Sequence, residues 1–419
     1  MRNLYLHQIL LLGATGGVAD IASLLPCLPP HSSDLGMDAA RAAADILQRA
    51  TVEDISWLER HRRTGEAWMY TRSGWEGMSP SDLGVRIPDG NEPQAAVVTL
   101  ASMHSSGYVR EHAVRLLAGQ RNGRELPFLL VRVNDWVEPV REAAKAAVRE
   151  RLVAEYAKHF VRCLTLVEDL RGERRAPHRA LIGEIETLLC TQVASPALDQ
   201  ALQSGGRELR RACVRIAAKS GDPALLRRAA LDSDPIVATA AARAITATWS
   251  AEALREVLPR LRVGPPAMRC LALKATCDRF PSEAEPYLRR SLVDDTSSVR
   301  ELARFLWQKT GQKPLDFAAF YRNGITESKG RAFAAVLYGL AETGGEADAP
   351  LFEPYLKDAR AAVRAAAVTG IGRCGRARYS EALLAALNDS NSRVAGLARR
   401  WVRLHVGRAQ ARRLPRRVD

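Results

Sequence analysis

A short motif recurs along this chain of 419 residues: an aspartate, four further residues and a valine, followed by an alanine-rich stretch. The complete copies join Asp135 to Val140, Asp232 to Val237, Asp294 to Val299, Asp358 to Val363, and Asp389 to Val394. Degenerate copies keep the register. Steps of 31 residues lead from 109 to 140, 237 to 268, 268 to 299, 299 to 330 and 363 to 394. A constant period of this length predicts an array of stacked repeats rather than one central core.

Each period predicts two helices joined by a turn. Within residues 221–248, Asp222 and Pro223 are typical of a helix start, because aspartate caps free N–H groups and proline fits the first turn. Residues 232–235 predict the turn, and apolar residues return at helical spacing after Ile236. Strand patterns are nearly absent, so we expect an all-α fold, an α-solenoid. No run of 18 apolar residues occurs, so we expect no membrane-spanning helix.

The blocks DPALLRRAALDSDPIVATAAARAI, VNDWVEPVREAAKAAV and LVDDTSSVRELARFL resemble HEAT repeats, and the short period is similar to the HEAT-like subclass of phycobilisome (bilin) lyases. The resemblance covers most of residues 1–63 and 94–406. It implies antiparallel helix pairs in a right-handed superhelix, with the second helices lining a concave surface. We expect residues 64–93 to be an irregular insertion and residues 407–419 to be a basic tail. Residues 153–190 predict helices longer than those of the other repeats.

An arginine usually follows the repeat valine. The resemblance implies that this arginine joins the turn aspartate in a ladder of ion pairs between repeats. A guanidinium that binds both oxygens of one carboxylate, here called a fork, satisfies several of its donors at once. The expected ladder residues are Asp135, Arg141, Asp294, Arg300, Asp358 and Arg364. A structural ladder explains these arginines, so their regularity does not indicate a nucleic-acid groove. The repeat valines, Val140, Val299 and Val363 among them, are predicted to be fully buried.

A second set of cations lies six residues after the valine position. This basic row consists of Arg115, Arg215, Arg243, Lys274 and Arg400. We expect the row to project into solvent, either as a hydrated face or as an electrostatic track for phosphates or an acidic protein. The formal net charge is +14, and residues 390–418 hold nine arginines and no acidic residue. This end of the chain therefore favours an acidic partner.

The insertion at 64–93 breaks the period and contains several aromatic residues. They are Trp68, Tyr70 and Trp75, and Arg72 lies among them. Aromatic residues of this density argue against simple disorder. Two interpretations stay open. Either the insertion packs over the concave groove as a plug, or these four residues anchor a binding partner.

Residues 13–19, GATGGVA, follow an apolar run and resemble the glycine-rich turn of a dinucleotide-binding fold. The third glycine of that pattern is missing and no second strand follows, so an ordinary helix junction is the better interpretation. The seven cysteines are scattered without a C-x-x-C motif, which predicts a reducing compartment and neither a disulfide framework nor a zinc site. We therefore expect no catalytic residue, no cofactor and no metal.

These features favour a bacterial-type, cytoplasmic scaffold that binds a protein, an acidic one among the options, on its concave surface without catalysis. One alternative is nucleic-acid (DNA) binding through the basic face, similar to HEAT-like alkylation-repair proteins. The other is a lyase or maturation-factor role, as in the bilin lyase relatives. Repeat arrays serve many partners, so the fold alone does not choose among these functions.

Overall fold

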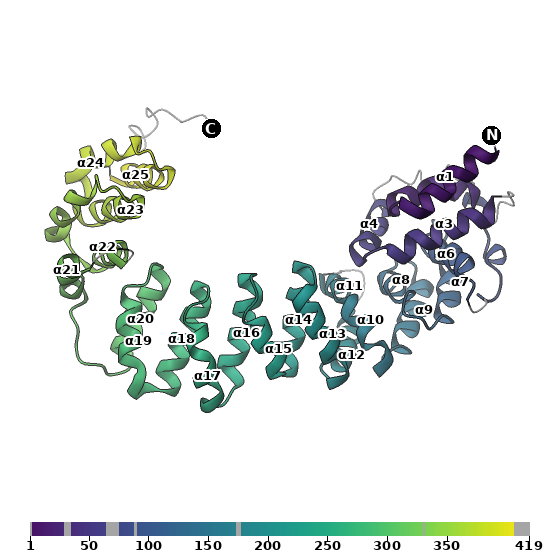
Figure 1. Ribbon diagram of the computed structural model, residues 1–419, viewed down its shortest axis with the longest axis horizontal. Coiled ribbons are helices and arrows are strands. Elements are labelled where there is room, and N and C mark those ends of the chain that lie inside the picture. The colour runs from purple at the N-terminus through teal and green to yellow at the C-terminus, as the bar shows by residue number, and fades with distance from the viewer. Residues whose placement is uncertain are drawn as a thin grey trace. The chain divides into compact units, whose positions relative to one another are not determined.

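The computed structural model describes residues 2–28, 35–63, 75–87, 90–172, 177–328, 330 and 332–405. These residues form helix after helix, without a strand among them, and sequence neighbours pack in pairs (Figure 1). The predicted all-α solenoid is therefore confirmed. The chain divides into two compact units, residues 1–241 (unit 1) and 242–419 (unit 2), with the boundary inside α16.

Unit 1 contains the helices α1 to α15 and the first half of α16. The bounds are α1 Arg2–Thr15, α2 Ile21–Leu24, α3 Gly36–Arg49, α4 Val52–Arg63, α6 Glu92–Ala101, α7 Gly107–Ala118, α8 Leu126–Arg132, α9 Glu138–Arg149, α10 Ala157–Arg162, α11 Leu164–Asp169, α12 Arg179–Leu189, α13 Ser195–Ser204, α14 Arg207–Ser220, α15 Pro223–Ala229 and α16 Pro235–Thr248. Two short 3-10 helices, η3 Trp75–Gly77 and η4 Pro80–Leu83, lie in the insertion.

Unit 2 continues the same pattern. Its bounds are α17 Ala251–Leu261, α18 Pro266–Arg279, α19 Ala284–Leu292, α20 Ser297–Lys309, α21 Phe317–Glu327, α22 Ala332–Thr343, η9 Glu346–Tyr355, α23 Ala361–Gly370, α24 Ser380–Ala385 and α25 Ser392–His405. A 3-10 segment, η9, takes the place of the first helix in one repeat, where Pro350 and Pro354 interrupt α-helical hydrogen bonding.

The helix boundaries follow the signals in the sequence. Gly221 ends α14 in the left-handed region at φ 72°, a conformation that costs glycine little. The Asp222 carboxylate then accepts hydrogen bonds from the N–H groups of Ala224 and Leu225 at 2.9 and 3.3 Å, and Pro223 occupies the first turn of α15. The glycine-rich residues 13–17 likewise span the end of a helix, since α1 ends at Thr15 and a 3-10 turn begins at Val18, so the interpretation as a helix junction is confirmed.

Each repeat buries its valine between helices, as predicted. Val140, Val299 and Val363 are at most 1% exposed. Within a repeat the first helix packs on the second, as in α8 with α9 and α19 with α20. Second helices also pack on each other, as in α7 with α9, α18 with α20, and α23 with α25. Because each pair covers its neighbour, apolar burial runs through the array without a central core.

The expectation of longer helices at residues 153–190 is wrong. The chain forms the short helices α10 and α11, of six residues each, with Cys163 between them, and then α12. Phe160, Leu164 and Val167 are all buried there. An apolar pattern of helical spacing can be met by consecutive short helices as well as by one long helix, so the pattern alone could not separate the two cases.

Candidate functional site

The arginine after the repeat valine forms a ladder that joins consecutive repeats. In unit 1, Arg110 on α7 donates from Nε and Nη2 to the two carboxylate oxygens of Asp135, at 2.9 and 2.8 Å. In unit 2, Arg364 on α23 makes the same fork with Asp389, at 2.8 and 2.9 Å. Further forks of this kind join Arg210 to Asp232 and Arg269 to Asp294. Each fork ties a second helix to the turn of the following repeat.

Asp135, Asp294 and Arg364 thus lie in the ladder as predicted, but Arg141, Arg300 and Asp358 do not share its forks. Within one repeat the arginine reaches the turn's backbone rather than its carboxylate: Arg300 donates to the carbonyl oxygen of Asp294 at 2.7 Å, and Arg364 to that of Asp358 at 2.8 Å. Nε and Nη2 of the same Arg364 guanidinium bind Asp389 of the next repeat. The ladder therefore runs from one repeat to the next, and among the described residues no arginine that follows a repeat valine forks the aspartate of its own turn.

The three exceptions have local causes. The repeat after Arg300 has Ile325 where a turn aspartate would stand, and Arg300 pairs with Glu342 on α22 instead. Arg141 donates to the carbonyl oxygens of Asp135 and Trp136 at 2.9 and 3.3 Å. Asp358 accepts side-chain and backbone hydrogen bonds from Arg360, and these bonds lower the pKa of Asp358 to about 2.

Unit 1 embeds its ladder in a buried ionic network. Arg132 on α8 donates to Asp135 at 2.8 Å and also pairs with Glu59 on α4. The side chains of Arg110, Arg132 and Asp135 are 0% exposed. Burial by itself would raise the pKa of Asp135, but the Arg110 hydrogen bond and the Arg132 charge lower this pKa below its usual value. Protein groups occupy both carboxylate oxygens, so the network stabilises the fold and offers no open site.

The basic row does face solvent, as predicted, and in unit 1 its cations are neutralised. Arg115 and Arg215 have side chains 69% and 50% exposed. Arg115 pairs with Glu111 at 2.6 Å, and Arg215 pairs with Glu168 at 2.8 Å. Each positive charge is therefore matched by a carboxylate of the same unit.

In unit 2 the row has no such partners. Arg243 on α16, Lys274 on α18 and Arg400 on α25 are exposed. Within the described part of the chain, no ion pair joins any of the three to a carboxylate. Their charges are consequently available to a partner of opposite sign.

Phe305 occupies the next position of the same row, six residues after Val299, and the sequence interpretation missed it. Its side chain is 58% exposed on α20, which packs against α18. Leu271 and Leu302 are half-buried on the same two helices. A search restricted to cations could not find this residue, although a plain alignment of the repeats places it beside Lys274. The face of α18 and α20 that carries the row therefore combines the cation Lys274 with an exposed aromatic ring.

Trp75, the one aromatic candidate of the insertion that the structure describes, is not placed as expected of a partner-binding loop. Trp75 is 0% exposed, and its indole Nε1 donates to the Leu25 carbonyl oxygen at 3.1 Å. Its own carbonyl oxygen lies 2.7 Å from Nε2 of His104, whose Nδ1 accepts from the N–H of Ser106. Trp75 is thus part of the unit 1 core and is unavailable as a surface anchor. The other candidates, Trp68, Tyr70 and Arg72, lie outside the described residues.

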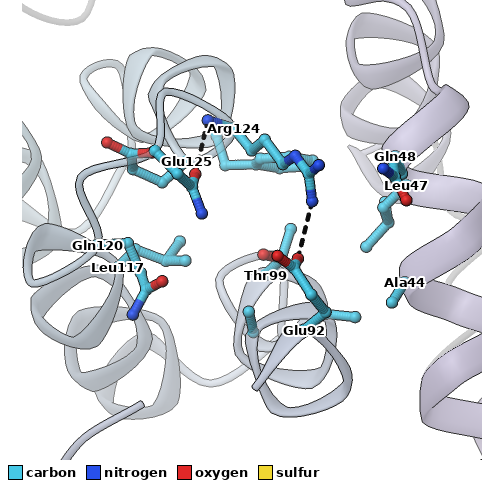
Figure 2. Close-up of a pocket in the computed structure, with 13 residues that line it drawn as sticks. Ala44, Leu47, Gln48, Glu92, Thr99, Leu117, Gln120, Arg124 and Glu125 are labelled. Atoms are coloured by element: carbon cyan, nitrogen blue, oxygen red, sulfur yellow. Dashed lines mark hydrogen bonds and ion pairs between the residues drawn. The ribbon is translucent and has the colours of Figure 1, made fainter. Parts of the chain in front are cut away.

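A small cavity in unit 1 lies between α3, α6, α7 and α8 (Figure 2). Arg124 crosses its mouth and pairs with Glu92 at 2.9 Å, while Gln48 and Thr99 line its walls. The enclosed volume is about 50 Å³, which suits a few water molecules. Oε2 of Glu125, a residue that lines this cavity, is buried without a hydrogen-bond partner in the protein.

The cysteine thiols show no sign of nucleophilic activation. Burial raises the pKa of Cys163 and Cys213 to about 12 and that of Cys277 to about 11, which disfavours the reactive thiolate. Across the described ranges, no group of three or more histidine, cysteine, aspartate or glutamate side chains is placed to hold a metal ion. The same ranges contain no helix long and apolar enough to cross a membrane.

Comparison with known proteins finds no family model and no curated protein that matches the chain.

Proposed function

We propose that the protein is a non-catalytic scaffold that binds another protein through the exposed face of its second helices in unit 2. The observation that supports this proposal is the row of Arg243, Lys274 and Phe305, where two unneutralised cations precede an exposed aromatic ring. A few buried anchor residues carry most of the binding energy at protein interfaces, aromatic residues are enriched there, and charges orient the partner. The proposed partner is an acidic segment that carries apolar side chains, such as an amphipathic helix.

The composition of this face favours a protein over a nucleic acid. Asp278 and Glu301 are exposed on α18 and α20, and they would repel a phosphate backbone laid along these helices. A protein segment can place basic side chains opposite these carboxylates and acidic ones opposite Lys274. Leu271 and Leu302, half-buried beside Phe305, extend the apolar part of the surface.

A second candidate function, nucleic-acid binding, is favoured by one observation at α25. This helix carries four exposed arginines and no acidic residue: Arg393, Arg399, Arg400 and Arg403. Such a helix would bind polyanions with an affinity that falls steeply as salt rises. The lyase or maturation-factor role stays a prediction from the resemblance. A reducing, cytoplasmic location is proposed from the seven free cysteines.

The proposed function can be tested by photo-crosslinking in the native host. Benzoylphenylalanine is placed at position 305 of the full chain, and the adducts are identified by mass spectrometry. We expect an adduct with a defined protein through an acidic segment, and we expect Lys274→Glu to lower its yield severalfold because that charge would repel the segment. The matched control carries the cross-linker at Val85 in unit 1, which is 93% exposed.

The proposal is overturned if position 305 yields no protein adduct, or if Val85 yields the same one. A nucleic-acid adduct at 305 would instead support the second candidate. That candidate has its own test, since fluorescence anisotropy with duplex DNA should then show binding that is lost when Arg399, Arg400 and Arg403 are changed to Gln together.

A further inference from the structure

We infer that unit 2 contains a binding site for a small organic anion, separate from the protein-binding face proposed above. The site is a pocket of about 740 Å³ between the α17–α18 turn, α19, the turn into α20 and the start of α22. This volume lies in the usual range of small-molecule sites, roughly 300–1,000 Å³. Arg262, Arg269 and Arg290 line it together with Tyr287.

Arg262 is held rigidly and still has a donor to offer. Its guanidinium carbon lies 3.3 Å from the centre of the Tyr287 ring, and its Nη2 donates to Thr276 Oγ1 at 3.0 Å. Its Nε is buried and donates to no protein acceptor. Stacking on an aromatic ring and a fixed second hydrogen bond preorganise the guanidinium for an anionic group.

Three arginines and two aspartates, Asp294 and Asp295, line the pocket, so it carries one net positive charge. Arg269 forks the Asp294 carboxylate and also donates to Asp295 at 2.8 Å, so its charge is fully used. Among the described residues, neither Arg262 nor Arg290 pairs with a carboxylate. An anion bound here would therefore gain two partners without displacing an existing ion pair.

The walls of the pocket indicate what accompanies the anionic group. Leu273, Val293 and Ala335 add apolar side chains to its lining. The ligand class that fits is a molecule with one carboxylate or phosphate group and an aliphatic or aromatic body. Inorganic anions would pair with the arginines but would make no contact with the apolar side chains.

An equivalent groove in unit 1 shows that the repeat does not require unmatched arginines. It measures about 690 Å³ and lies beside the Arg210–Asp232 fork. Arg228 occupies the position of Arg290, four residues before the turn aspartate, but it pairs with Asp199. The unit 2 pocket thus differs in that neither Arg262 nor Arg290 pairs with a carboxylate of the described residues. The unit 1 groove provides a matched control.

The test uses 8-anilinonaphthalene-1-sulfonate, a fluorescent organic anion, titrated into the full chain. We expect saturable binding at one site whose Kd rises by about tenfold or more in Arg290→Gln and in Arg262→Gln, because each loses a charge-assisted hydrogen bond. Arg228→Gln should leave the Kd unchanged. Competition with benzoate and with phenyl phosphate, which share an aromatic body, then distinguishes a carboxylate from a phosphate ligand.

Equal Kd values for the wild type and Arg290→Gln would overturn the inference, as would an equal loss in Arg228→Gln. Arg290 is exposed, so its substitution tests the site even if Arg262→Gln unfolds the repeat. Phe305→Ala should leave the dye's Kd unchanged, and this separates failure of the anion site from failure of the proposed protein-binding face.

Discussion

The cations of the basic row pair with carboxylates in unit 1, whereas among the described residues those of the same row in unit 2 do not. Arg115 and Arg215 pair with glutamates, and Arg243 and Lys274 do not. The sequence repeats this difference on a larger scale: residues 1–241 hold 30 basic and 29 acidic residues, and residues 242–419 hold 31 and 18. One repeat geometry thus tolerates either arrangement. The net charge of +14 is therefore a property of unit 2 and not a requirement of the solenoid.

The forks of the ladder also differ in how deeply they are buried. Both side chains of the Arg110–Asp135 fork are 0% exposed, and Arg132 and Glu59 extend the fork into a network. The Arg364–Asp389 fork has side chains 14% and 10% exposed. The Arg210–Asp232 fork, also in unit 1, has side chains 20% and 6% exposed. The Arg110–Asp135 fork thus depends on buried charges that must all be paired, while the other forks stay partly hydrated.

The largest expected effect tests whether the two units share one kind of core. Val140→Asp and Val299→Asp should each lower the free energy of unfolding by about 4 kcal/mol or more, because each buries an unpaired carboxylate. Hydrogen exchange measured by mass spectrometry should show lost protection in the unit that carries the change. A much milder result for Val299→Asp than for Val140→Asp would contradict the common core.

The core and the fold could be predicted because they depend on local periodicity. The spacing from Asp294 to Val299 places the valine one turn into a helix, and the 31-residue period requires stacking. The ladder was predicted only in part. Sequence offsets name the arginine and the aspartate, but not whether the fork closes within a repeat or between repeats, since that depends on the rotation between helix pairs.

The site could be predicted less well, because exposure and pairing are three-dimensional properties. The position of Lys274 in the basic row follows from the period, and Glu111 lies at the helical i,i+4 offset from Arg115. Glu168, which neutralises Arg215, lies on another helix at no offset that the period fixes. Trp75 illustrates the same limit: an aromatic residue in an irregular segment has no period to reveal that it packs beneath Leu25 and His104.

The next prediction compares the two ladders directly. Asp135→Ala should cost about 3–5 kcal/mol, because it leaves Arg110 and Arg132 buried without their carboxylate. Asp389→Ala should cost about 1–2 kcal/mol, because Arg364 can turn toward water. Chemical denaturation of both variants measures the difference. Equal losses would show that burial does not distinguish the ladders.

A smaller effect concerns acid stability in unit 2. The folded pKa of Asp358 is lowered to about 2 by Arg360, so this carboxylate stabilises the fold fully above its unfolded pKa, near 4. The contribution is lost as pH falls from about 4 through 2. Asp358→Asn should therefore melt a few degrees below the wild type at neutral pH and at the same temperature near pH 2. A difference in melting temperature that persists in acid would show that the asparagine disturbs packing instead.

The smallest expected effect returns to the exposed row. Arg215→Ala removes an ion pair with Glu168 whose arginine is half exposed, so it should cost less than about 1 kcal/mol. Arg243→Ala removes a cation without a carboxylate partner and should leave stability unchanged. High salt provides the control, since the deficit of Arg215→Ala relative to the wild type should shrink when the pair is screened. If Arg243→Ala were instead the more destabilising change, its charge would have a structural role within the chain. The basic row of unit 2 could then no longer be regarded as surface available to a partner.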